Sequence, residues 1–331
     1  MKIAVVGCGA VGSYYGARLS IAGHEVHFLL RSDYEIVKAN GVQVVTVDGE
    51  FTARPKCARD PKEIGPADLV VIGLKTTANG QFAKLISPLV GDSTAVLTLQ
   101  NGLGNEEQLA ALFGNEKVLG GLCFVCINRI APGQIQHIAH GTIVMGEFGR
   151  PALPRTHAIA GAIQESGVPC KVSDNLEQAH WEKLVWNVPF NGLGVAGAAG
   201  YEAVISGKVD TSKKLGPCLT SDILLADPRW EDLVRDLMME TIRAAQALGL
   251  PVKDSAAQKQ IDRTREMGAY RASTLIDFER GQELELDALF FEPLRQAKKA
   301  GVNTPRLEAM CEVLQQLNQP APRPISRSVA L

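Results

Sequence analysis

The sequence predicts an α/β protein in two parts: a doubly wound sheet with added antiparallel strands, followed by an all-helical C-terminal domain. Three observations support this. Strands and helices alternate early in the chain, extended segments follow them, and beyond residue 173 nearly every apolar pattern is helical. We expect one domain over residues 1–173 and another over 174–331, in which residues 319–331 form a loosely ordered, proline-rich tail.

The first strand and helix carry a dinucleotide-binding signal. Residues 2–6 form a short β-branched run, and a helix is expected over residues 13–22. Between them stands Gly7-Cys8-Gly9-Ala10-Val11-Gly12. The first glycine permits a sharp turn, the second permits backbone to approach a pyrophosphate, and the third permits close helix packing. Phosphates would sit at the helix N-terminus, so this segment predicts a Rossmann-type cofactor site.

Arg31 indicates which dinucleotide binds. The second strand, residues 25–30, ends at the position where NAD-binding proteins usually have an acid for the ribose 2′-hydroxyl. Arg31 suits a 2′-phosphate instead, so we predict NADP(H). Asp33 and Glu35 lie close by and keep NAD open.

The alternation of strands and helices continues to about residue 172. The expected strands are 67–74, 95–99 and 168–172, and the expected helices are 79–89, 106–113 and 156–165. Residues 118–148 are expected to form antiparallel strands with turns at 132–133 and 140–141. Lys75 and Asn101 each follow a parallel strand, so both are expected at the cofactor edge of the sheet.

The second domain is expected to be helical. The predicted helices cover 175–187 and an open-ended continuation, 230–248, 253–267, 284–300 and 305–317. Residues 198–219 show no clear period, and both an inserted loop and a lid remain open.

Polar side chains recur within an apolar stretch of the first of these helices. Lys183, Asn187 and Asn191 are four residues apart and share one helix stripe beside Trp186 and Phe190. Because buried polar groups are costly unless hydrogen-bonded, this stripe faces either water or a polar ligand.

The overall composition excludes several protein classes. Hydrophobic residues make up 46% of the 331 residues, charged residues make up 21%, and the net charge is −2. No basic excess favours nucleic acid or anionic membranes, and no apolar run approaches a membrane span. The chain enters its first strand at once, so we expect no signal peptide and a cytoplasmic location.

The cysteines and histidines show no metal-binding pattern. Cys123 and Cys126 have CxxC spacing but no second pair, so we interpret them as core residues and expect no metal. His180 is expected at the surface.

Together these motifs resemble the ketopantoate reductase (2-dehydropantoate 2-reductase) family over nearly the whole chain. The resemblance includes Ser273 and Glu285 in a late segment. It implies reduction of ketopantoate to pantoate with NADPH, on the route to coenzyme A. It also implies a small-molecule partner, with monomer and homodimer both open.

The resemblance also implies residue roles. Lys183 and Glu285 match the family's catalytic residues, and Lys183 would stabilise and protonate the carbonyl oxygen. Asn101, Asn187, Asn191 and Ser273 match substrate- or cofactor-contacting positions. The cofactor positions are Gly7, Cys8, Gly9, Ala10, Val11, Gly12, Arg31, Lys75 and Asn101.

The chain departs from the family pattern near the expected substrate residues. Gly192 follows Asn191 where proline is frequent, Pro189 is expected to kink the helix, and Leu284 replaces threonine. Two alternatives therefore remain open: a reductase of another 2-oxo acid, and an NADPH-binding sensor without turnover. The sensor is disfavoured because it has no use for Lys183 and Glu285.

Overall fold

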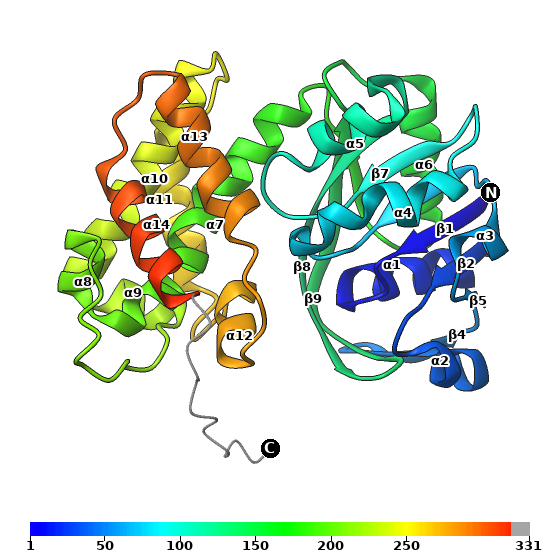
Figure 1. Cartoon of the computed structure of the whole chain (residues 1–331), viewed down its shortest axis with the longest axis horizontal. Helices are drawn as coiled ribbons and strands as arrows, with labels where there is room; N and C mark the ends of the chain where they lie inside the picture. Colours follow the sequence, from blue (N-terminus) through cyan, green and yellow to red (C-terminus); the bar gives the residue numbers. More distant parts are fainter. Residues whose placement is uncertain (319–331) are drawn as a thin grey trace. The chain divides into compact units, whose positions relative to one another are not determined.

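The computed structural model describes residues 1–318 (Figure 1). The chain divides into two compact units, Met1–His180 and Trp181–Leu331, and the division falls within helix α7 (Leu176–Ala196). The tail expected over 319–331 lies outside the described residues.

The first unit is built on a sheet whose central part is parallel. The order of its parallel strands is β5-β2-β1-β6-β7-β8, so the chain runs outward from β1 in both directions. The order reverses between β1 and β6, which is the position where doubly wound sheets bind dinucleotides. The bounds are β1 (Lys2–Val6), β2 (Glu25–Leu29), β5 (Lys56–Ala58), β6 (Leu69–Ile72), β7 (Ala95–Thr98) and β8 (Val118–Ala131).

Beyond β8 the sheet becomes mixed. β9 (Gln134–Glu147) runs antiparallel to β8, and β10 (Cys170–Val172) pairs with β9 in parallel. β3 (Val42–Thr46) also pairs with β9, and β4 (Gly49–Ala53) closes that edge. The expected antiparallel strands are therefore confirmed, but β3, β4 and β5 were not among the elements predicted from the sequence.

The turn predicted at 140–141 is wrong. His140 and Gly141 lie inside β9, where the pairing with β8 shifts register at Phe124 and Val125. Both residues have positive φ, 63° and 132°. A β-bulge, like a tight turn, can contain residues with positive φ. The His140-Gly141 pair is therefore compatible with either structure, and this explains the incorrect prediction.

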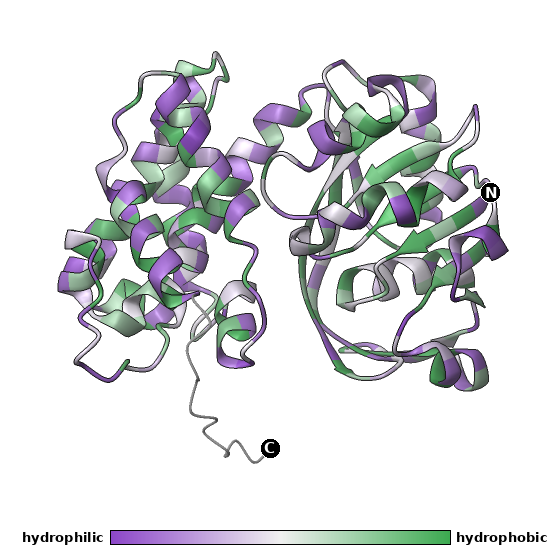
Figure 2. Cartoon of the chain, viewed as in Figure 1, coloured by the Kyte–Doolittle hydropathy of each residue, from purple (hydrophilic) through white to green (hydrophobic). Residues whose placement is uncertain are grey.

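Helices cover both faces of this sheet (Figure 1). α1 (Ala10–Ile21) and α6 (Pro154–Glu165) pack on one face with Ile3 and Val5 of β1. Ala4 and Val6, which alternate with these two residues along β1, pack on the other face with α3 (Pro61–Ile64), α4 (Phe82–Ile86) and α5 (Asn105–Phe113). Strands with two apolar faces therefore stand between helices of mixed hydropathy (Figure 2), which is the pattern of a doubly wound sheet.

Some local boundaries differ from expectation. The helix predicted over 79–89 is broken into the 3₁₀ turns Thr76–Gln81 and Ser87–Leu89 around α4. A short helix, α2 (Tyr34–Asn40), follows β2.

The second unit is helical, as predicted, over its described residues. Its helices after α7 are α8 (Tyr201–Ser206), α9 (Ser221–Ala226), α10 (Pro228–Ala247), α11 (Ser255–Arg265), α12 (Ser273–Glu279), the π-helix η5 (Asp287–Phe291), α13 (Glu292–Lys299) and α14 (Pro305–Leu317). The two-part fold class expected from the sequence is therefore confirmed.

The unassigned stretch 198–219 is partly helical. It contains α8, and its remainder is attached to neighbouring elements by hydrogen bonds. The backbone N–H of Gly216 donates to Ala198 O at 2.8 Å, and that of Leu219 donates to Gly194 O at 2.9 Å. Gln316 of α14 holds the chain at Val209 with a further bond of 3.0 Å. Residues 210–217 are exposed and belong to no helix or strand, so this part of the stretch is a surface loop that these bonds anchor to its neighbours.

Within residues 1–318, none of the helices combines the length and the apolar character needed to cross a bilayer.

Candidate functional site

The glycine loop after β1 is shaped by close backbone approaches. Gly7 has φ of 92°, and a Cβ atom there would lie 2.3 Å from the backbone nitrogen of Leu74, after β6. A Cβ on Gly12 would lie 2.3 Å from Gly7 O. Both positions therefore require glycine, because any side chain would push α1 and the loop apart from the sheet.

Gly9 is different because the space beside it is open. It is the N-cap of α1 with φ of −77°, and a Cβ atom there would meet nothing within 4 Å. Ala10 and Val11 form the first turn of α1 and are half-buried. Unbonded N–H groups and the helix dipole favour an anion at such a position. The loop therefore fits the pyrophosphate of a dinucleotide.

Cys8 lies between the two loop glycines and faces the interior. Its Sγ lies 3.6 Å from both Val5 O and Leu29 O. Burial, with smaller contributions from Cys57 and Asp33, raises the pKa of the Cys8 thiol well above its ordinary value. The thiol is therefore neutral near pH 7 and adds no negative charge to the anion site.

Replacing Gly9 with alanine is expected to weaken dinucleotide binding without unfolding the protein. The added methyl group fits the backbone but occupies the space left for the cofactor, so we expect affinity to fall about tenfold or more. Fluorescence titration with NADPH, alongside the melting temperature, measures both effects. Gly161→Ala on α6, which also meets no atom within 4 Å, is the matched control. Unchanged NADPH affinity in Gly9→Ala would contradict the placement of the cofactor.

Three other expected site residues follow parallel strands at the same edge of the sheet. Arg31 is exposed beyond the end of β2, and Lys75 is exposed just before the 3₁₀ turn that follows β6. Asn101 is half-buried after β7. The register pairs Val6 with both Leu29 and Ile72, so the strand ends lie side by side. The sheet therefore brings these side chains to the edge that carries the glycine loop.

A chain of amide side chains secures the segment after β7. Gln100 Nε2 donates to Asn79 Oδ1 at 2.8 Å, and Asn79 Nδ2 donates to Asn105 Oδ1 at 2.9 Å. Asn105 in turn donates to the backbone oxygen of Asn101 at 3.1 Å. Gln100 and Asn105 are 4% and 1% exposed, so these bonds are protected from water and fix the backbone at Asn101. No local sequence pattern identified Asn79 or Asn105.

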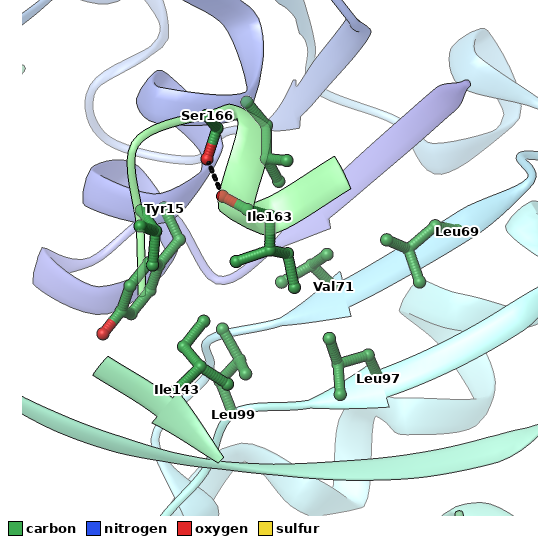
Figure 3. Close-up of a pocket in the computed structure, with 10 residues that line it drawn as sticks. Tyr15, Leu69, Val71, Leu97, Leu99, Ile143, Ile163 and Ser166 are labelled. Carbon is green, nitrogen blue, oxygen red and sulfur yellow. Dashed lines mark hydrogen bonds between the residues drawn. The ribbon is translucent and has the colours of Figure 1, made fainter. Parts of the chain in front are cut away.

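The cavity drawn in Figure 3 is not part of this edge. It lies in the core between the sheet and helices α1 and α6, among side chains such as Leu69, Val71 and Ile163. Its two hydroxyl groups are already bonded: Tyr15 donates to Gly141 O at 3.1 Å, and Ser166 donates to Ile163 O at 2.6 Å. It is therefore a packing void without the polar groups that recognise a ligand.

In the second unit, α7 carries the polar stripe. The helix extends unbroken through Pro189, so Lys183, Asn187 and Asn191 do lie on successive turns of one helix. Lys183 is half-buried, whereas Asn187 and Asn191 are 7% and 3% exposed. A fully solvated helix face is thereby excluded for the two asparagines.

Asn191 connects α7 to the start of α12. Its Oδ1 accepts from the backbone N–H of Thr274 at 3.1 Å and from Ser273 Oγ at 3.3 Å. Its Nδ2 lies 3.4 Å from Asn187 Oδ1. Asn187, Asn191 and Ser273 therefore form one hydrogen-bonded group, although 82 residues separate Asn191 from Ser273.

Aromatic and apolar side chains occupy neighbouring positions of α7. Trp186 packs against Phe190 in a tilted arrangement with 5.1 Å between ring centroids, and its Nε1 donates to Thr264 Oγ1 at 2.9 Å. Gly192, where the family often has proline, faces Met310 of α14, and a Cβ atom there would lie 2.3 Å from Met310 Sδ. Glycine at this position thus accommodates the close packing of α14 on α7.

Glu285 lies just before the π-helix η5 and is 8% exposed. Its carboxyl group is therefore largely shielded from solvent.

His180 does not lie at the surface as expected. It is 7% exposed, and its Nε2 lies 3.0 Å from Glu106 Oε1 of α5. The two residues are 74 positions apart, so no local pattern could reveal the bond that makes burial of this ring acceptable. Among residues 1–318, no group of three or more His, Cys, Asp and Glu side chains could hold a metal ion.

The sheet order and the glycine loop at its reversal point are those of a dinucleotide-binding α/β protein. Residues 3–150 match the family described as ketopantoate reductase PanE/ApbA, and residues 175–318 match its C-terminal domain. The chain belongs to the ketopantoate reductase family, whose members are reductases that use a nicotinamide dinucleotide.

Individual relatives align from end to end. A 2-dehydropantoate 2-reductase from a Nostoc species is 36% identical over 96% of this chain and 95% of its own. The crystal structure of a 2-dehydropantoate 2-reductase from Geobacter metallireducens is 42% identical, with a TM-score of 0.86 over 96% of this chain and 99% of its own. One from Methylococcus capsulatus is 31% identical, with a TM-score of 0.83 over 96% of each chain.

Proposed function

We propose that this protein reduces 2-dehydropantoate to pantoate with NADPH. The observation that carries the proposal is the buried group of Asn187, Asn191 and Ser273 one helical turn from Lys183, in a chain that matches 2-dehydropantoate 2-reductases along its whole length. NADPH, when bound, supplies the hydride that reduces the C2 carbonyl.

Lys183 stabilises and protonates the oxygen of that carbonyl. Negative charge grows on the oxygen as the carbon is reduced, and an ammonium group close to it lowers the barrier and then donates the proton. Lys183 is half-buried on α7, and partial removal of an ammonium group from water strengthens this interaction. Glu285 is the second catalytic residue of the proposal, and its carboxylate orients the lysine.

The asparagines and Ser273 bind the rest of the 2-oxo acid. Their neutral amide and hydroxyl groups can bond a carboxylate or a hydroxyl group without competing with Lys183 for the proton. The cofactor part of the proposal assigns the pyrophosphate to the glycine loop and the 2′-phosphate to Arg31. Lys75 and Asn101 are assigned to the nicotinamide end.

Arg31→Ala is expected to weaken NADPH binding far more than NADH binding. Loss of a charge-assisted contact to the 2′-phosphate should raise the NADPH dissociation constant by about tenfold or more, because such bonds contribute roughly 1.5–3 kcal/mol. Titrations with both cofactors at one ionic strength measure the difference. Equal weakening of both cofactors would show that Arg31 does not recognise the 2′-phosphate.

The decisive experiment follows NADPH oxidation by its absorbance, with ketopantoate beside a panel of other 2-oxo acids and an NADH control. Preferential turnover of ketopantoate supports the proposal. Turnover of a different 2-oxo acid would retain the chemistry of Lys183 and reject the substrate. Cofactor binding without turnover of any acid would reject the enzymatic role.

The proposal includes a cytoplasmic location, and it leaves both a monomer and a homodimer possible. Subcellular fractionation tests the location, and light scattering coupled to size-exclusion chromatography gives the mass in solution.

A further inference from the structure

The carboxylate of Asp33, two residues beyond Arg31, has its hydrogen-bonding capacity filled. Oδ1 accepts from Arg129 Nη2 at 2.5 Å and from Ser32 Oγ at 2.8 Å. Oδ2 accepts from Arg129 Nε at 2.9 Å and from the backbone N–H of Gly133 at 3.2 Å. A carboxylate offers about four acceptor sites, so no site remains for a further donor such as a ribose hydroxyl.

This carboxylate is held firmly. The Asp33 side chain is 7% exposed, and the fork of Arg129 grips it through two parallel bonds. Burial by itself would raise the pKa of Asp33, but the bonds from Arg129, Ser32 and Gly133 outweigh it and lower the pKa. The carboxylate therefore stays ionised and paired near pH 7.

Asp33 lies in the region that determines the specificity for NAD or NADP in dinucleotide-binding proteins of this fold. In NAD-binding members of this fold, an acid near the end of the second strand accepts from the ribose 2′-hydroxyl and repels a 2′-phosphate. Asp33 follows β2, whose last residue, Leu29, pairs with Val6 directly before the glycine loop. Glu35, the other nearby acid, forms an ion pair with Arg59, 2.5 Å away. Both side chains are exposed, and exposed ion pairs contribute little stabilisation.

We propose that Arg129 is a specificity-determining residue, which acts by neutralising Asp33 and withdrawing it from the ribose so that NADPH is preferred over NADH. Arg129 lies on β8, near the tip of the hairpin formed with β9, 96 residues from Asp33. It is a positioning residue rather than a contact to the cofactor. This inference rests on the NADPH preference of the proposed function but not on the identity of the 2-oxo acid.

The test compares Arg129→Met with the double variant Arg129→Met/Asp33→Asn, using dissociation constants for NADPH and NADH. Freed from Arg129, Asp33 should repel the 2′-phosphate and accept from the 2′-hydroxyl. The ratio of the NADH constant to the NADPH constant should therefore fall about tenfold in the single variant. The ratio should recover in the double variant, because the amide that replaces the carboxylate carries no charge.

Controls separate this effect from general damage. Arg150→Met removes a partner of the buried Glu147 in the same unit, so it should lower the melting temperature and leave the ratio unchanged. Arg129→Lys retains the charge and should largely retain the ratio, which keeps the proposal testable if Arg129→Met folds poorly. A wild-type ratio in Arg129→Met, or no recovery in the double variant, would overturn the proposal.

Failure of this inference is distinguishable from failure of the proposed function. The binding ratio requires no 2-oxo acid, so absence of ketopantoate turnover would leave it intact. Conversely, ketopantoate turnover with an unchanged ratio in Arg129→Met would reject only the role of Arg129.

Discussion

Replacing Lys183 with alanine is expected to lower kcat for ketopantoate reduction by about 1,000-fold, the combined scale of losing a proton donor and an oxyanion partner. The affinity for NADPH should hardly change, because the glycine loop and Arg31 belong to the other unit of the chain. Steady-state kinetics with ketopantoate and a fluorescence titration with NADPH measure the two quantities.

Lys259→Ala provides the control for this substitution. Lys259 lies on the exposed side of α11 in the same unit, so its loss should leave kcat unchanged. Turnover by Lys183→Ala close to that of the wild type would reject the lysine as the proton donor. A parallel loss of kcat and NADPH binding would instead indicate that the substitution disturbs the fold.

Glu147→Gln is expected to lower the free energy of unfolding by about 3 kcal/mol near pH 7, the scale of breaking a buried ion pair. The Glu147 side chain is fully buried at the end of β9. It accepts from Arg155 Nε at 2.9 Å and Nη2 at 2.6 Å, from Thr156 Oγ1 at 2.6 Å, and from Arg150 Nη2 at 3.0 Å. Glutamine would leave two arginines without their charge partner.

The size of this loss should depend on pH in a defined direction. Burial would raise the pKa of Glu147, but bonds from Arg155, Thr156 and Arg150 lower it below the ordinary value of 4.5. A carboxyl whose pKa is lower in the folded state stabilises the fold at pH values above the unfolded pKa. That contribution disappears as the pH falls through the folded pKa. The difference between wild type and Glu147→Gln should therefore be largest above about pH 5 and shrink in more acidic solution.

Urea unfolding from pH 3 to 7 measures this difference. Glu165→Gln, an exposed position on α6, is the control and should change the unfolding free energy little at any pH. A difference that stays constant with pH would mean that the ionised form of Glu147 is not what stabilises the fold.

Local patterns predicted the main elements of each unit. Three signals are local in the sequence, so they could be recognised without knowledge of tertiary contacts. They are the β-branched run 2–6, the spacing of Gly7, Gly9 and Gly12, and the apolar pattern of α7. β3 and β4 also carry a local signal, because Asp48-Gly49 follows the β-branched run of β3 and Asp-Gly is typical of a hairpin turn. The pairing of β3 with β9, however, joins residues 91 positions apart, such as Gln43 and Gln134, and could not be predicted from that signal.

The candidate site was less predictable than the fold. Residue types at strand ends and on α7 pointed to Lys75, Asn101 and Lys183, but not to the bonds that hold their surroundings in place. The pairs Asp33–Arg129 and Glu106–His180 join segments 96 and 74 residues apart. The buried polar side chains in these pairs are acceptable only because of their distant partners, and sequence spacing carries no information about those partners.

The hydrogen bonds of Asn191 fix the orientation of its side-chain amide, so that Oδ1 and Nδ2 cannot be exchanged. A backbone N–H donates and never accepts, so the atom facing Thr274 must be Oδ1, and Nδ2 must face Asn187. Asn187 accepts that bond through its own Oδ1, and its Nδ2 is left to offer a donor. If the pair binds the substrate as proposed, this direction suits oxygen acceptors and disfavours the 2-amino acid that corresponds to a 2-oxo acid. The ammonium group of such an amino acid would bring one hydrogen-bond donor against another.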